Sequence, residues 1–190
     1  MNMNGIAVGV GDQNAGLGCA AGEIAGKLIA EDKNGVANVA ILNYPNLAQI
    51  EVRADNIEKC LLQAAPKAKI VGRYLGGTTE NGLKSMTEAL KQHPEIDVVA
   101  SINDAGAYGA LTALQAAGKD SKSTIIVGID AEAKARELIK AGNFFRGTVD
   151  TAPALTGEAT INGTVKLLAG GSMPKQVEGK IVKVTKDSLK

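Results

Sequence analysis

The sequence predicts an α/β fold of three layers, in which helices cover both faces of a mainly parallel sheet. Short apolar runs alternate along the chain with longer segments whose apolar residues recur every three to four positions. The apolar runs are nearly continuous, which is typical of strands buried on both faces. Parallel neighbours need right-handed crossovers, and the alternation provides a helix for each one. With 190 residues, 45% hydrophobic and 22% charged, the chain suits one soluble globular domain.

The elements follow in order from this pattern. Strands are expected at 5–11, 37–44, 68–75, 97–103, 124–130, 144–150 and 179–185. Helices are expected near 15–31, 47–64, 79–92, 105–117, 131–141 and 153–169. In the third helix, Leu83, Met86 and Leu90 recur at spacings of three and four, as the apolar face of a helix requires. The stretch 169–179 contains several Gly residues and a Pro, and is expected to be an irregular joint.

Composition argues against several classes of function. The 21 Lys and Arg residues nearly balance the 20 Asp and Glu residues, and no basic cluster with interleaved aromatics is present, so no nucleic-acid partner is expected. No run approaches the roughly 18 apolar residues of a membrane span. The first residues lack the charged and apolar regions of a secretory signal peptide. The chain is therefore expected to be either cytoplasmic or a fragment whose signal lay elsewhere.

Cofactor, metal and catalytic patterns are weak. Gly9, Gly11 and Gly16 do not have the spacing of a dinucleotide-binding loop, and no phosphate-binding G-K-[ST] occurs, so no cofactor is expected. The only histidine, His93, precedes a proline at a predicted helix end, where capping explains it better than metal binding. No nucleophile has a recognisable partner base, so we expect that the chain is not an enzyme. Cys19 and Cys60 are far apart and are expected to be small buried hydrophobes rather than a disulfide.

Polar side chains follow most of the predicted strands, at the edge where an α/β sheet binds its ligands. They are Asp12, Gln13 and Asn14, then Asn43 and Tyr44, Asn103 and Asp104, Asp130, and Asp150. Each Asn or Asp taken singly is explained as a helix cap. Together they form a rim able to hold hydroxyl groups, to which Arg53 would add a forked cation. Asp104 is expected to cap the helix that follows it, while Asn103 points into the cleft.

Several segments resemble one known family. They are "HPEIDVVASINDAGAYGALTALQAAGK", "IIVGIDAEAKARELIKAGNFFRGTVDTAPALTGEAT", "DQNAGLGCAAGEIAGKLI" and "VRADNIEKCL". This pattern is similar to that of type I periplasmic sugar-binding proteins of ABC transporters, the ribose-binding-like relatives of lactose-repressor-type regulators, and it runs from about residue 6 to 187. The resemblance implies two α/β lobes joined by a hinge, with a sugar between them. Residues 1–190 match the carboxy-terminal lobe alone, and 153–175 would normally pack with the first lobe.

The resemblance also implies roles for single residues. Arg53 and Asn103 correspond to the sugar-binding arginine and asparagine, and Asp130 to the aspartate of V-G-x-D. Asp150 stands at the hinge where ribose-binding members usually have glutamine, and Asn14 lies near the first hinge crossing. With Asp104, these residues form the expected ligand-binding set.

Two features depart from the family pattern. Asn56 and Ile57 replace a usual Gly-Phe, and Gly76 and Gly77 lie where an aromatic often stacks on the sugar. Weaker stacking on a sugar ring is therefore expected.

The leading hypothesis is a non-catalytic lobe that binds a sugar or polyol and, in its full-length parent, serves an ABC transporter permease from the periplasm or, as a lipoprotein, from the cell exterior. A single lobe leaves one side of the ligand in water, so weak affinity is expected. The surface around 153–169 would be exposed, which favours a homodimer. The alternatives are the effector-binding core of a lactose-repressor-type regulator and a stand-alone lobe without a ligand. An enzyme with a flavodoxin-like sheet ranks last.

Overall fold

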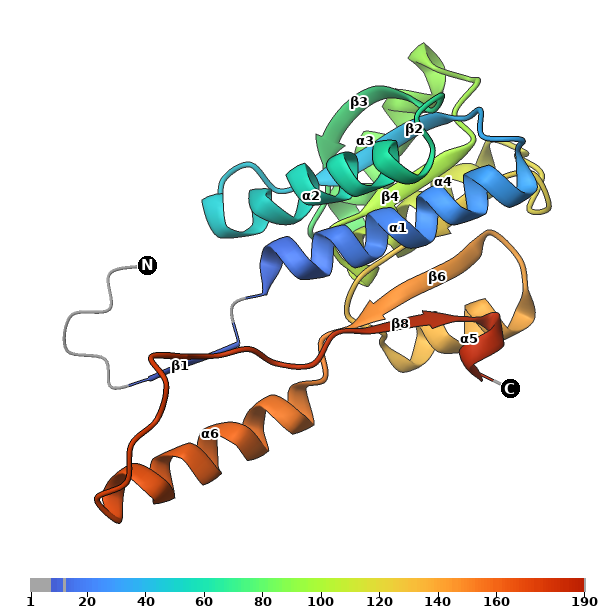
Figure 1. The fold of residues 1–190 in the computed structure, drawn as a ribbon. Helices are drawn as coiled ribbons and strands as arrows, with labels where there is room; N and C mark the ends of the chain where they lie inside the picture. Colours follow the sequence, from blue (N-terminus) through green and yellow to red (C-terminus); the bar gives the residue numbers. More distant parts are fainter. Residues whose placement is uncertain (1–7, 12, 190) are drawn as a thin grey trace.

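The computed structural model describes residues 8–11 and 13–189. At its centre lies a six-stranded sheet with the order β3-β2-β4-β5-β6-β8 (Figure 1). Its strands are β2 (Asn38–Asn43), β3 (Lys69–Leu75), β4 (Val98–Ser101), β5 (Ile125–Val127), β6 (Phe145–Asp150) and β8 (Val182–Thr185). Neighbouring strands are parallel except β8, which runs antiparallel to β6. The prediction of a mainly parallel sheet is confirmed.

Helices cover both faces of this sheet. They are α1 (Asn14–Asp32), α2 (Ala48–Ala64), α3 (Thr79–Gln92), α4 (Asp104–Ala116), α5 (Ala133–Ala141) and α6 (Pro153–Leu168), with a final 3₁₀ turn η1 (Lys186–Leu189). All six helices lie within two residues of their expected bounds. Successive residues of β2 show the layering. Val39 and Ile41 belong to an apolar cluster that includes residues of α1 and α2, whereas Ala40 and Leu42 belong to a second cluster that includes residues of α3, α4 and α5. The three-layer prediction is confirmed.

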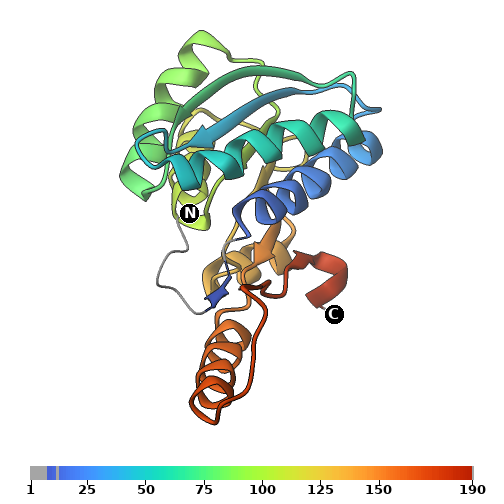
Figure 2. The same ribbon diagram turned by 60° about the vertical axis from the view of Figure 1, so that its left-hand side comes forward.

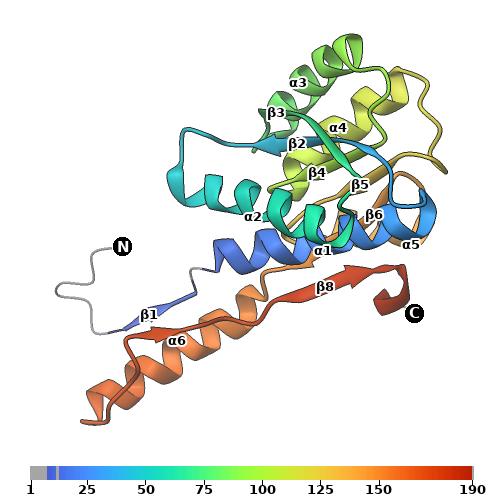
Figure 3. The same ribbon diagram turned by 45° about the horizontal axis from the view of Figure 1, so that its top comes forward.

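Helix α6 extends away from the three-layer body (Figures 1 and 2). Beside it run two short parallel strands, β1 (Gly9–Val10) and β7 (Gln176–Val177), which form a separate small sheet (Figure 3). The sequence predicts a strand at 5–11, but β7 lies inside the expected irregular joint 169–179. Residues 5–7 of the first expected strand lie outside the described residues. The last expected strand, 179–185, begins only at Val182. The first residue of that expected strand instead contacts the segment before α1, because the Gln13 side chain donates a hydrogen bond to the Gly179 carbonyl.

Helices α1 and α2 approach each other unusually closely. A Cβ atom at Gly18 would lie 2.2 Å from the Arg53 carbonyl oxygen, and one at Gly22 would lie 2.4 Å from that of Ile57. Glycines spaced four apart on α1 thus form a flat face against the backbone of α2. Among the described residues, no helix is long and apolar enough to cross a membrane.

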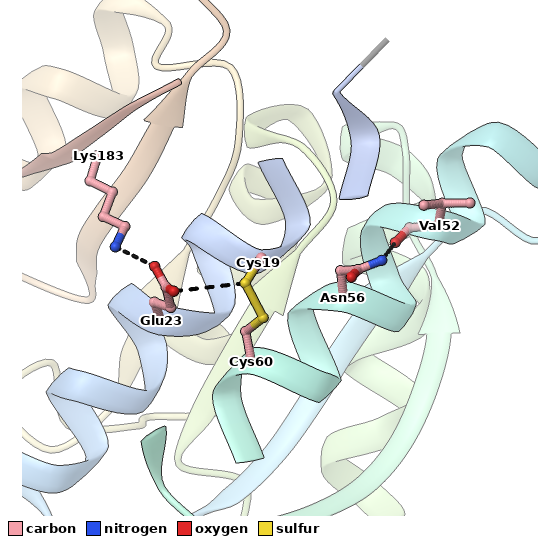
Figure 4. The surroundings of a disulfide bond; sticks show 6 residues. All are labelled: Cys19, Glu23, Val52, Asn56, Cys60 and Lys183. Atoms are coloured by element: carbon pink, nitrogen blue, oxygen red, sulfur yellow. Dashed lines mark hydrogen bonds and ion pairs between the residues drawn. A yellow bond between two sulfur atoms is a disulfide. The ribbon is translucent and has the colours of Figure 1, made fainter. Parts of the chain in front are cut away.

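The close approach of α1 and α2 corrects the cysteine prediction. Cys19 on α1 and Cys60 on α2 form a disulfide, with their Cα atoms 5.1 Å apart (Figure 4). They are distant in sequence, but the glycine face brings the two helices within the range that a disulfide spans. Next to the bridge, Glu23 forms an ion pair with Lys183 of β8, which ties α1 to the sheet edge.

Candidate ligand-binding site

Two adjoining hollows open at the carboxyl ends of the central strands, and Arg53 and Asp130 line both. The first measures about 280 Å³ and is lined by Tyr44, Leu47, Ile50, Arg53, Gly77, Thr78, Ile102, Asn103 and Asp130. The second measures about 440 Å³ and is lined by Val10, Gly11, Gln13, Asn14, Leu17, Arg53, Asp130, Thr151, Pro153, Thr156 and Gly179. The second therefore lies between the three-layer body and the start of α6. This is the edge at which ligands bind in open α/β sheets.

Arg53 on α2 is held in one orientation by its neighbours. Its Nε donates a 2.6 Å hydrogen bond to Asn14 Oδ1, and its Nη1 donates a 3.0 Å bond to the Ile102 carbonyl. Nη1 also lies 3.8 Å from Asp130 Oδ1. Burial lowers the pKa of Arg53, and the charge of Asp130 opposes that effect. Within the described part of the chain no acceptor meets Nη2, so its protons are available to a ligand.

Asp130 provides the complementary acceptor. It follows β5 in a turn, and its side chain is 34% exposed toward the hollows. Burial raises the pKa of Asp130 to about 6, although nearby Arg53 acts in the opposite direction. At neutral pH the carboxylate is therefore ionised and accepts hydrogen bonds. A fixed cation beside a partly exposed carboxylate can hold adjacent hydroxyl groups, because one donates to the acid and the other accepts from the guanidinium.

The helix cap expected at Asp104 is made by Asn103, which also keeps its expected place at the hollow. Asn103, not Asp104, caps α4, since its Oδ1 accepts a 3.0 Å hydrogen bond from the Gly106 amide. Its Nδ2 donates a 2.8 Å bond to the Gly77 carbonyl, and the residue lines the first hollow as expected. The cap belongs to Asn103 because its backbone is extended, whereas Asp104 is already the first helical residue.

Asp104 is fully buried between α4 and the sheet and lines neither hollow. Its carboxylate accepts hydrogen bonds from Thr148 Oγ1 at 2.8 Å and from the Glu132 amide at 2.9 Å. Burial raises its pKa to about 7, while these two hydrogen bonds oppose the shift. A direct ligand contact by Asp104 would need the carboxylate to leave this position.

The remaining site residues occupy the crossing between the body and α6. Asn14 begins α1 and lines the second hollow, where it orients Arg53. Asp150 ends β6 but does not line either hollow. Its Oδ2 accepts a 2.6 Å bond from Arg136 Nη2, and its Oδ1 accepts a 2.7 Å bond from the Ala152 amide. Asp12, also part of the expected rim, lies outside the described residues.

One wall of the first hollow is apolar, and of its three residues the expected rim contained only Tyr44. Tyr44, Leu47 and Ile50 form this wall, and Leu47 is 54% exposed. The Tyr44 ring lies over Gly77, where a Cβ atom would come within 2.5 Å of it. An aromatic ring therefore lies beside the glycine pair that marked a departure from the family pattern. The signal was present in the sequence, because Tyr44 directly follows a strand end.

Comparison with known proteins decides the family. A family model described as a periplasmic binding protein domain matches residues 7–172. The chain belongs to this family. A periplasmic binding protein of known sequence, the ribose import binding protein of Bacillus subtilis, is 28% identical over 158 residues, which cover 82% of this chain.

Solved periplasmic binding proteins have the same fold. A solute-binding protein of Actinobacillus succinogenes, crystallised with D-allose, superposes over 95% of this chain with a TM-score of 0.83 and 28% identity. A myo-inositol-binding protein from Caulobacter superposes over 91% with a TM-score of 0.79 and 27% identity. The present chain spans only part of these proteins, matching 50% of the Bacillus protein and 62% and 60% of the two crystallised chains.

Proposed function

We propose that this chain is a ligand-binding lobe of a non-enzymatic solute-binding protein that delivers a sugar or polyol to an ABC importer. The observation that supports this most strongly is the pairing of Arg53 with Asp130 at the junction of two hollows, where Arg53 Nη1 lies 3.8 Å from Asp130 Oδ1. Of the similar proteins described above, one is named for ribose, one was crystallised with D-allose and one is a myo-inositol-binding protein. All three compounds are rich in hydroxyl groups.

The geometry suits a neutral ligand with several hydroxyl groups. Arg53 can donate through Nη2, which has no acceptor among the described residues, and Asp130 accepts. The opposing charges balance, so the site does not require a charged ligand. The apolar wall of Tyr44, Leu47 and Ile50 suits the C–H face of a ring whose hydroxyl groups turn toward the charged pair. These contacts bind and release a ligand without covalent chemistry.

We further propose that segment 153–175 packs with a first lobe in the full-length parent. Helix α6 leaves Ile161, Val165 and Leu168 exposed at 65%, 60% and 84%, an unusual apolar surface for a helix in water. The solved relatives are longer than this chain, which supports a second lobe as the partner. Closure of such a lobe would cover the open side of both hollows. The isolated chain is therefore expected to bind its ligand weakly.

The disulfide supports an exported protein. Disulfides persist in the periplasm and outside the cell, whereas the cytosol keeps thiols reduced. The Cys19–Cys60 bridge therefore favours a component of an importer over the effector-binding core of a cytosolic regulator, which shares the fold.

A nuclear magnetic resonance titration of the isotope-labelled chain tests this function. D-ribose, D-allose and myo-inositol would be added separately at millimolar concentrations, with ethylene glycol as a control for non-specific effects. We expect saturable shift changes confined to the linings of the two hollows, centred on the amides of Arg53, Asn103 and Asp130. Equal, non-saturable changes across the surface with all compounds would contradict the proposal. Micromolar affinity in calorimetry would contradict the expected weakness of a single lobe.

A further inference from the structure

The turn that presents Asp130 has an uncommon backbone conformation. Asp130 has φ 121° and the next residue, Ala131, has φ 55°. Residues other than glycine rarely adopt a positive φ, and two such residues in succession persist only where their surroundings hold them. The position of the ligand-facing carboxylate therefore depends on whatever fixes residues 129–132.

Two buried side chains behind the turn make those contacts. Asp104 Oδ2 accepts the Glu132 amide at 2.9 Å, and Thr148 Oγ1 accepts the Ala131 amide at 3.2 Å. The Thr148 hydroxyl donates its single proton to Asp104 Oδ1 at 2.8 Å. Both side chains belong to fully buried residues. The two amides that follow Asp130 are thus held by one connected pair.

The backbone around this pair is equally well determined. The Asp104 amide donates to the Ile129 carbonyl at 2.7 Å, and the Asp130 amide donates to the Val149 carbonyl at 2.8 Å. Gly128 leaves room for the carboxylate, since a Cβ atom there would lie 2.2 Å from Asp104 Oδ1. The carboxylate therefore fills a space that the backbone of β5 and its turn leaves open for it.

We propose that Asp104 and Thr148 are positioning residues, which hold the 129–132 turn so that Asp130 faces Arg53 in the ligand hollows. Asp104 is part of the site through the turn rather than through contact with ligand. This inference rests on the proposed function for its effect on ligand binding. The position of Asp130 can be measured without any ligand.

Substitutions can remove the hydrogen bonds of the Asp104–Thr148 pair selectively. The Thr148 hydroxyl gives its proton to Asp104, which leaves an oxygen lone pair for the Ala131 amide. Thr148→Val retains the branched shape and removes both bonds, whereas Thr148→Ser retains both. Asp104→Asn keeps the shape of the carboxylate, but its NH2 group faces either the Thr148 hydroxyl or the Glu132 amide, both of which donate to Asp104 in the parent. Thr124→Val is a matched control, because Thr124 is also buried but lies before β5, at the opposite end of that strand.

The experiment compares these variants by nuclear magnetic resonance in three measurements: the Asp130 amide shift, the carboxyl titration midpoint of Asp130, and the shift changes induced by D-ribose, D-allose and myo-inositol. In Thr148→Val and Asp104→Asn we expect the first two to move and sugar affinity to fall about tenfold or more, the scale of a lost hydrogen bond to a charged group. Thr148→Ser, which retains both hydrogen bonds, should give the parent values in all three measurements. Thr124→Val should leave all three measurements unchanged.

Unchanged Asp130 shifts and midpoint in both Thr148→Val and Asp104→Asn would overturn the positioning role, even if both variants were less stable. Changed Asp130 shifts with undiminished sugar affinity would overturn its importance for binding. If the parent chain binds none of the three compounds, the proposed function fails. The ligand-free shifts and midpoint then still decide whether the pair positions Asp130.

Discussion

Removal of the Cys19–Cys60 bridge should destabilise the chain substantially. The two cysteines are separated by 41 positions, so the bridge closes a loop that runs from α1 through β2 to the second half of α2. In the chain-entropy treatment, cross-linking a loop of this length removes enough freedom from the unfolded state to contribute about 4 kcal/mol to the free energy of unfolding. For a chain of this size, that loss corresponds to a fall in melting temperature of roughly 10 °C.

Urea and thermal denaturation test this value in the parent chain, with and without dithiothreitol, and in a Cys19→Ala/Cys60→Ala variant. The reduced parent and the double variant should lose similar stability, because both lack the cross-link. The reductant should have no effect on the double variant, which serves as the control. The reasoning would be refuted if reduction left the stability of the parent within about 1 kcal/mol of the oxidised value, the scale of a typical point mutation.

Two further predictions concern pH and assembly. Burial raises the pKa of Asp104 to about 7 and that of Asp130 to about 6, so the folded chain holds these protons more tightly than the unfolded chain does. Their stabilising contribution is complete below about pH 4, the range of an unperturbed aspartate, and is lost as pH rises through these values. The stability of the parent relative to Asp104→Asn, from urea denaturation, should therefore fall between pH 4 and 7, and a constant difference would contradict the burial argument. The exposed apolar residues of α6 predict self-association at high concentration, which Ile161→Lys should weaken; light scattering that finds a strict monomer at all concentrations would count against it.

The sequence pattern predicts the features that depend on local periodicity. Helix α3 has its expected bounds because Leu83, Met86 and Leu90 mark its apolar face and Thr78 caps its first turn. Asn103 and Asp130 meet at one hollow because strand ends of a parallel sheet share an edge, and Arg53 joins them from the first half of α2.

What escaped prediction depends on contacts between elements. The disulfide requires the lateral packing of α1 on α2, although the spacing of Gly18, Gly22 and Gly26 was a signal of close approach. The roles of Asn103 and Asp104 depend on a helix start that differs by one residue, which periodicity does not resolve. Strand β7, within the expected irregular joint, has only two residues, too few for any alternating pattern.

The most direct test of the central claim compares sugar affinity in Arg53→Lys and Arg73→Lys. Both variants keep the positive charge and lose the guanidinium fork. Arg53 lines both hollows, whereas Arg73 on β3 pairs with Asp55 and Glu58 away from them. In a nuclear magnetic resonance titration with the sugar that the parent binds best, we predict that Arg53→Lys weakens binding about tenfold or more, while Arg73→Lys binds as the parent does. Equal affinity in Arg53→Lys and the parent would contradict the account.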